Sequence, residues 1–189
     1  MNFTEKKIVY FDEAGSKNTS MTLKAAKKRA DELDIRTIVV ASSHGKTAME
    51  AFDLFGEKEI VVVTICKSFN EEGWTMSSEK RNEITSKGMK ILTCPHTLGD
   101  GVSSSIAEKY GGRSIEEIIR DTFYRFSQGM KVCVEITLMA ADAGLVGVDK
   151  EIIAIAGTNG GADTAVVIKP SYSRKFYDLG ILEIIAKPR

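Results

Sequence analysis

The sequence contains few of the residues that build disulfide frameworks or metal sites. Its three cysteines, Cys66, Cys94 and Cys133, are scattered along the chain and include no Cys-x-x-Cys pair. This pattern argues against disulfides and predicts reduced, buried thiols in a cytoplasmic protein. The two histidines, His44 and His96, do not form the closely spaced ligand pairs typical of zinc, so we expect no metal site.

The chain also lacks an excess of either charge and a long uninterrupted apolar run. Lys and Arg number 26 and Asp and Glu number 26, so the formal net charge is zero. A neutral chain is unsuited to binding nucleic acid through a broad positive potential. The apolar run 132–148 is broken by Glu135 and Asp142, and the N-terminus has no apolar signal-peptide core. We therefore expect neither a membrane span nor a signal peptide.

Short apolar segments that alternate with helical segments predict an α/β fold. The predicted strands are 6–11, 37–42, 59–66, 90–95, 151–157, 165–170 and 181–188, and the predicted helices are 18–34, 46–55, 77–88, 103–112 and 114–129. This order favours a three-layer α/β/α architecture with a mostly parallel sheet, in one domain spanning residues 1–189. The closing strands are joined by too little helix for parallel crossovers, so an antiparallel edge or a hairpin-like return is expected.

The segment Lys131–Gly144 fits two periodicities. Val132 and Val134 alternate as in a strand, whereas Cys133 and Ile136 belong to a helical repeat. Its length and its Ala-Asp-Ala-Gly ending favour a helix.

Three polar side chains, Glu135, Thr137 and Asp142, stand inside this apolar segment. A buried carboxylate must either face a polar cavity, which would make it a candidate site residue, or find a structural hydrogen-bond partner. The sequence leaves both alternatives open for Glu135.

The loop after the strand predicted at 37–42 is the first candidate for ligand binding. It consists of Ser42, Ser43, His44, Gly45, Lys46 and Thr47 and leads directly into a helix. Free amides and the positive end of a helix attract an anion, and hydroxyls and a lysine add donors. The loop is not a Walker A motif, because Val40 stands where that motif has its first glycine. It predicts a phosphate site, with a helix cap and a solvated lysine as the alternative.

A second candidate loop follows the strand predicted at 151–157. Its candidate residues are Thr158, Gly160, Gly161, Asp163 and Thr164. Such a loop is flexible and rich in amides and hydroxyls. Because adjacent glycines lose much conformational entropy on folding, ligand contact is favoured over a plain turn.

Both loops lie in segments that resemble the C-terminal domain of pyruvate kinase. TIVVASSHGKTAMEAFDLF followed by EIVVVT is similar to its strand, phosphate loop, helix and next strand, and IIAIAGTNGGADTAVVI is similar to its later glycine-rich loop between two strands. With KIVYF and KVCVEITLMAADAG, the whole chain resembles a stand-alone family of pyruvate kinase C-terminal-domain-like proteins.

This resemblance implies a three-layer α/β/α fold and a phosphorylated ligand, for which it suggests flavin mononucleotide (FMN). It does not imply pyruvate kinase activity, because the chain has no barrel domain and no site for phosphoenolpyruvate. We expect the FMN phosphate on both loops and the flat ring near Thr64–Phe69 and Trp74. Glu135, Thr137 and Asp142 would line the far side if their segment faces the cleft.

Three functions follow as hypotheses. The first is an FMN protein with redox activity on an unknown substrate, whose catalytic residues stay unassigned. The second is a non-enzymatic sensor that binds a sugar phosphate or a nucleotide. The third is a structural protein that forms a homo-oligomer, which a neutral chain permits.

Overall fold

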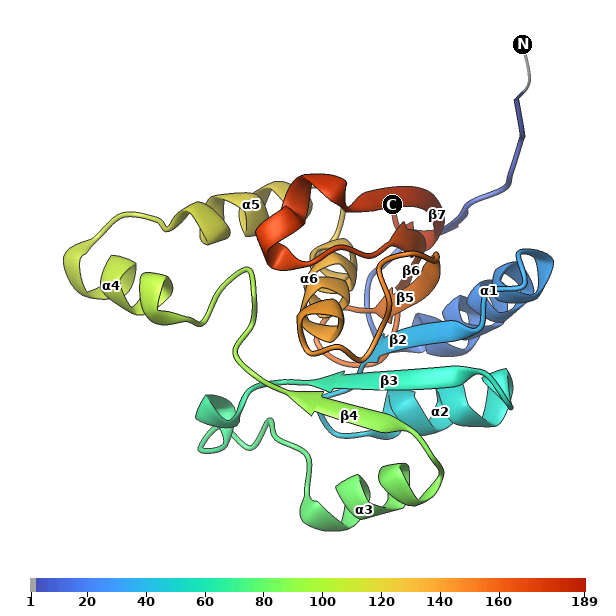
Figure 1. Cartoon of the computed structure of the whole chain (residues 1–189), viewed down its shortest axis with the longest axis horizontal. Helices are drawn as coiled ribbons and strands as arrows, with labels where there is room; N and C mark the ends of the chain where they lie inside the picture. Colours follow the sequence, from blue (N-terminus) through green and yellow to red (C-terminus); the bar gives the residue numbers. More distant parts are fainter. Residues whose placement is uncertain (1–2) are drawn as a thin grey trace.

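The computed structural model describes residues 3–189 and is built on a seven-stranded sheet (Figure 1). The strands are β1 (Val9–Phe11), β2 (Thr37–Ala41), β3 (Glu59–Thr64), β4 (Lys90–Thr93), β5 (Ile152–Ala156), β6 (Thr164–Lys169) and β7 (Gly180–Pro188). Their spatial order is β1-β7-β6-β5-β2-β3-β4. Only β6 runs antiparallel to its neighbours, so the predicted mostly parallel sheet is confirmed.

Helices cover both faces of this sheet. They are α1 (Thr19–Glu32), α2 (Lys46–Phe55), α3 (Ser78–Ser86), α4 (Val102–Tyr110), α5 (Ile115–Phe123) and α6 (Gln128–Asp142), with short 3-10 turns η1 (Ser16–Asn18), η2 (Lys67–Phe69) and η3 (Ser173–Asp178). The first three α-helices pack on one face and α6 on the other, which confirms the three layers. Within the described residues, no helix is both long and apolar enough to cross a membrane.

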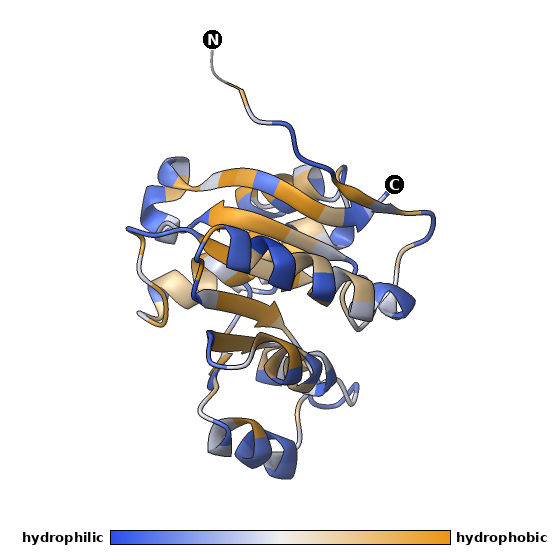
Figure 2. Cartoon of the chain, turned by 90° about the vertical axis from the view of Figure 1, so that its right-hand side faces the viewer, coloured by the Kyte–Doolittle hydropathy of each residue, from blue (hydrophilic) through white to orange (hydrophobic). Residues whose placement is uncertain are grey.

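The central strands are apolar on both sides because each side has its own core. Ile38 and Val40 of β2 point into the core beneath α1 and α2, whereas Val39 points into the core beneath α6. Figure 2 shows the strands in orange, with blue along the outer faces of the covering helices. A strand buried on both faces needs no hydrophobic alternation, which explains the continuous apolar runs in the sequence.

The segment Lys131–Gly144 is helical, as its length and ending predicted. It lies in α6, whose first turn is capped by the Ser127 hydroxyl accepting from the Met130 amide. The prediction of one helix over 114–129 is wrong, because α5 ends at Phe123 and α6 starts afresh. Gly129 lies in the first turn of α6, where a Cβ atom would be 2.3 Å from Thr164 Oγ1.

The closing strands pair as expected, but they do not form the edge of the sheet. β6 lies antiparallel between β5 and β7, and β1 adds outside β7 in parallel. The sequence pattern predicted strand from residue 6, whereas β1 starts at Val9.

Glu135 has structural partners for both of its carboxylate oxygens. Lys131 Nζ donates to Oε2 at 2.6 Å, and the Leu98 amide donates to Oε1 at 3.0 Å. The Glu135 and Lys131 side chains are only 2% and 8% exposed. The geometry is that of the structural hydrogen-bonding alternative, and the pair ties the loop before α4 to the centre of α6.

Replacing Lys131 by methionine should destabilise the protein by about 3–5 kcal/mol, because a buried carboxylate would lose its charge partner. The free energy of unfolding in urea measures this change. The double variant Lys131→Met/Glu135→Gln removes the charge yet keeps an oxygen for the Leu98 amide, so it should recover much of the loss. A single variant as stable as the parent chain would contradict the pairing.

Candidate functional site

The loops that carry the predicted site residues lie at the carboxyl end of the parallel strands. The strands β2, β3, β4 and β5 are mutually parallel, so their carboxyl ends lie together along the same side of the sheet. Three helices also begin here: α2 follows β2, Gly161 packs on Ser16 and Thr19 at the start of α1, and Gly129 of α6 packs on Thr164. Loops at the carboxyl ends of parallel strands are the usual ligand sites of α/β folds.

The loop 42–47 forms the start of α2 and leaves its amides open. Gly45 is the N-terminal cap with a φ of 89°, and the Ser42 hydroxyl accepts from the Ala48 amide at 3.2 Å. Among residues 3–189, no hydrogen-bond acceptor faces the five consecutive amides of Ser43–Thr47. The first turn of α2 contains no acidic residue. This helix end therefore presents an uncompensated row of donors, which suits an anion.

Side chains around these amides add further donors. Lys46 is exposed, and its Nζ approaches only Glu50, at 4.0 Å, among the described residues. Thr47 is buried as a residue, yet its hydroxyl and that of Ser43 have no hydrogen-bond partner within residues 3–189. His44 is held differently, with Nε2 lying 3.0 Å from the Gly73 carbonyl oxygen.

The second loop starts beside the first. Since Val40 pairs with Ile155 in parallel register, the residues that follow β2 and β5 leave the sheet next to each other. Within the described chain, the amides of the range 157–161 donate no hydrogen bond. Gly161 adopts a φ of 68°, and a Cβ atom there would lie 2.5 Å from Thr19 Oγ1. Only glycine fits this close contact with the start of α1.

Asp163 and Thr164 are buried, and their hydrogen bonds connect the second loop to the segments that precede α1 and α6. The Gly15 amide donates to Asp163 Oδ2 at 2.9 Å, and the Thr164 hydroxyl donates to Oδ1 at 2.8 Å. Thr164 Oγ1 also lies 3.1 Å from Ser127 Oγ, the cap of α6. Thr158 is half-buried, whereas Gly160 is exposed.

Two other predicted residues are engaged inside the layers. Thr64, at the carboxyl end of β3, bonds to Thr93 with 2.6 Å between the two Oγ1 atoms. Thr137 donates to the Cys133 carbonyl oxygen within α6 and is fully buried. Like Glu135, Thr137 is buried in the middle of α6 and does not border the open row of amides.

The aromatic side chains expected near a flat ring lie next to the first loop. Phe69 and Trp74 stack with ring centroids 5.5 Å apart and planes 10° apart, and Phe69 also stacks on His96. Trp74 stays half-exposed, so one face of the stack remains accessible. Gly73, which contacts His44 of the loop, is the residue directly before Trp74, so Trp74 lies close to the loop.

Two basic residues of α3, Lys80 and Arg81, lie near the site, and no pattern in the sequence predicted them as site residues. A Cβ atom on Gly45 would lie 2.5 Å from Lys80 Cγ, so the Lys80 stem lies against the start of α2. Arg81 donates from Nη2 to Thr93 Oγ1 at 2.7 Å. Only the packing of α3 beside α2 and β4 reveals these neighbours.

The cysteines show no sign of activation. Burial raises the pKa of Cys94 and, more strongly, the pKa of Cys133, so both thiols stay protonated at neutral pH. Cys66 and Cys133 are buried and Cys94 is half-buried, and all three are free. Within residues 3–189, no group of three or more His, Cys, Asp or Glu side chains is placed to hold a metal ion.

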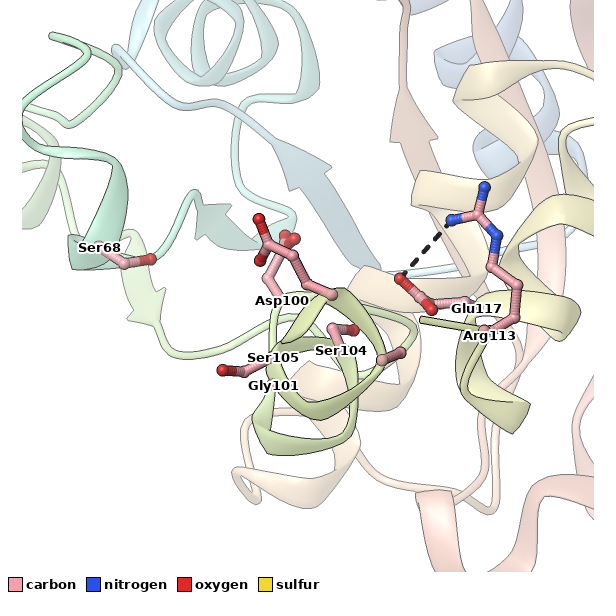
Figure 3. A pocket seen from close by; sticks show the side chains of 10 residues that line it. Ser68, Asp100, Gly101, Ser104, Ser105, Arg113 and Glu117 are labelled. Atoms are coloured by element: carbon pink, nitrogen blue, oxygen red, sulfur yellow. Dashed lines mark ion pairs between the residues drawn. The ribbon is translucent and has the colours of Figure 1, made fainter. Parts of the chain in front are cut away.

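A cavity of about 450 Å³ lies away from both loops, between η2, the start of α4 and the turn before α5 (Figure 3). Its lining includes Ser68, Asp100, Ser104, Arg113 and Glu117. Ser68 belongs to the range 64–69 predicted to lie near the flat ring, whereas no residue of the two candidate loops contributes to the lining. Asp100 Oδ2 lies 2.5 Å from His96 Nδ1, and this hydrogen bond lowers the pKa of Asp100. The candidate phosphate site is therefore an open shelf, separate from this cavity.

Comparison with known proteins agrees with this architecture. The family model described as pyruvate kinase, alpha/beta domain, matches residues 20–168. The chain belongs to this family, because the match covers most of its length and includes both candidate loops.

Two solved structures illustrate the likeness and its limits. One is a pyruvate kinase from Cryptosporidium parvum, with 11% identity and a TM-score of 0.43 over 81% of this chain and 23% of that one. The other is a pyruvate kinase of the same organism in complex with ADP, with 12% identity and a TM-score of 0.43 over 81% of this chain and 24% of that one. The chain thus spans about a quarter of the length of these enzymes.

The close contact at Gly45 gives a prediction about stability. Gly45→Ala should destabilise the protein more than Gly88→Ala, although both glycines have a φ between 80° and 90°. At Gly88 nothing lies within 4 Å of the added Cβ atom, so only the left-handed backbone is penalised, by about 1–2 kcal/mol. At Gly45 the new atom also displaces Lys80. Urea unfolding of both variants measures the difference, and equal losses would contradict the contact.

Proposed function

We propose that this chain binds a phosphorylated small molecule on the shelf formed by loop 42–47, with the loop 157–161 beside it. The observation that carries the proposal is the row of five amides, Ser43–Thr47, without an acceptor among the described residues. Backbone donors at a helix start, with an adjacent lysine and two hydroxyls that have no partner within residues 3–189, match the oxygens and the charge of a phosphate dianion.

FMN is the first ligand to test, and the residues present fit it. Its phosphate would be held by the amides of Ser43–Thr47 and the Thr47 hydroxyl. Its flat apolar ring would lie against the accessible face of Trp74, next to the loop. Bound flavin would supply hydride or single-electron transfer, and this chain would contribute binding, orientation and partial exclusion of water.

A sensor that binds a sugar phosphate remains the second candidate. The observation that favours it is that the shelf offers open backbone amides, the exposed Lys46 and the Thr47 hydroxyl, which suit any phosphate oxygen. A sensor needs only the anion seat and a second surface that responds to it.

Thr47→Val should weaken binding of the phosphorylated ligand by about tenfold or more, because one hydrogen bond to a charged group contributes about 1.5–3 kcal/mol. The substitution is nearly isosteric and removes a hydroxyl with no partner within residues 3–189, so stability should change little. Lys46→Ala should have a similar effect on binding. Lys24→Ala is the matched control, since Lys24 is exposed on α1 and outside the shelf.

The measurement is titration calorimetry with FMN, fructose 1,6-bisphosphate and inorganic phosphate in turn. Riboflavin, which lacks the phosphate, should bind far more weakly than FMN. Tight binding of FMN followed by bleaching on addition of a reduced nicotinamide supports a redox enzyme, whereas preference for the sugar bisphosphate supports a sensor. Unchanged affinity in both Thr47→Val and Lys46→Ala would remove the shelf from the site.

A further inference from the structure

The helices α4 and α5 form a hairpin that points away from the three layers. In Figure 1, α4 lies far from the sheet, and the chain returns through α5 to α6. Helix α4 contains no buried residue. Five large apolar side chains of this hairpin are between 55% and 79% exposed: Val102, Ile106, Tyr110, Ile115 and Ile118.

These exposed side chains are arranged as stripes. Val102, Ile106 and Tyr110 recur every four residues and line one side of α4. Helix α5 has two apolar sides, because Ile119 and Phe123 pack on the core beneath α6, whereas Ile115 and Ile118 face solvent. A surface helix normally needs one apolar stripe, so the second stripe of α5 is unexplained by the fold of one copy.

Energetics also indicate that something covers the hairpin. A helix of nine residues is marginal in water unless tertiary contacts support it. A shallow, open hollow of about 500 Å³ lies between the two helices, and its lining includes Ile106, Ala107 and Ile115. The hairpin therefore offers an apolar hollow and, at the end of α4, the protruding ring of Tyr110.

We propose that a second copy of this chain covers the hairpin, and that two hairpins pack antiparallel around a two-fold axis. A two-fold contact requires one surface that is complementary to itself, and the hairpin presents both a protruding side chain, Tyr110, and a hollow. The exposed fractions of these five residues correspond to roughly 600 Å² of surface per copy. With the polar side chains around them, the face matches the ~800 Å² per partner that stable complexes bury.

Charge favours a second copy over a strongly charged partner. The chain has 26 basic and 26 acidic residues, so two copies approach without net repulsion. The stripes themselves carry no charged side chain. Two hairpins brought together would give four short helices around a shared apolar core, an arrangement that buries the outer stripes of α4 and α5.

The test is sedimentation of the full chain between about 1 and 100 µM, a range in which a micromolar dimer dissociates and forms. We expect a dimer for the parent chain. Ile106→Glu should weaken dimerisation by about thirtyfold or more, because it places an unpaired charge at the centre of the interface. Met21→Glu, at an exposed apolar position on α1, is the matched control and should leave the dimer intact.

A second measurement keeps the test independent of folding defects. In hydrogen exchange, the amides of α4 should gain protection as the protein concentration rises, whereas those of α2 should not change. A parent chain that stays monomeric at about 100 µM would overturn the proposal. So would a dimer that Ile106→Glu leaves intact, or α4 protection that is the same at all concentrations.

Discussion

The buried carboxylate of Asp163 is the constraint on which the site end of the molecule depends. It accepts from the Gly15 amide and from Thr164, whose hydroxyl in turn contacts Ser127. One side chain thus fixes three segments: the approach to α1, the first residue of β6 and the cap of α6. A fully buried carboxylate is tolerated only when such donors satisfy it.

This carboxylate also distinguishes α1 and α6 from α2, three of the helices that begin at the same end of the sheet. Asp163 brings a negative charge near the starts of α1 and α6, where positive helix ends favour it. Within residues 3–189, no such internal anion faces α2, and no acidic residue stands in its first turn. The fold therefore compensates the starts of α1 and α6 itself and leaves the amides of Ser43–Thr47 without an acceptor among the described residues. This asymmetry is the physical reason why the proposed shelf is centred on one loop.

The sequence predicted the parts of this arrangement that depend on neighbours along the chain. A β-branched strand followed by a short polar loop and an amphipathic helix was sufficient to locate the residues 42–47. It was insufficient for contacts made across the sheet. Asp163 bonds to Gly15, which is 148 positions away, and Lys80 reaches Gly45 only because α3 packs beside α2. For Glu135, the sequence indicated that a partner was required, but only α6 and the loop before α4 supplied it.

The path of the chain explains why the hairpin is separate from the shelf. From β4 at one edge, the chain must return past β3 and β2 to reach β5, and α6 packs across that face. The crossover from β4 to β5 therefore needs only α6, and α4 and α5 are additional helices. Within residues 3–189, their outer apolar stripes pack against neither of the two cores. Glu135 of α6, paired with Lys131, accepts from the Leu98 amide and so anchors the loop that leads into α4. The first turn of the same helix contacts Thr164. Helix α6 thus touches both the base of the proposed phosphate shelf and the root of the hairpin. The segment 68–74 also lies between them, because Gly73 contacts His44 and Ser68 lines the cavity beside α4.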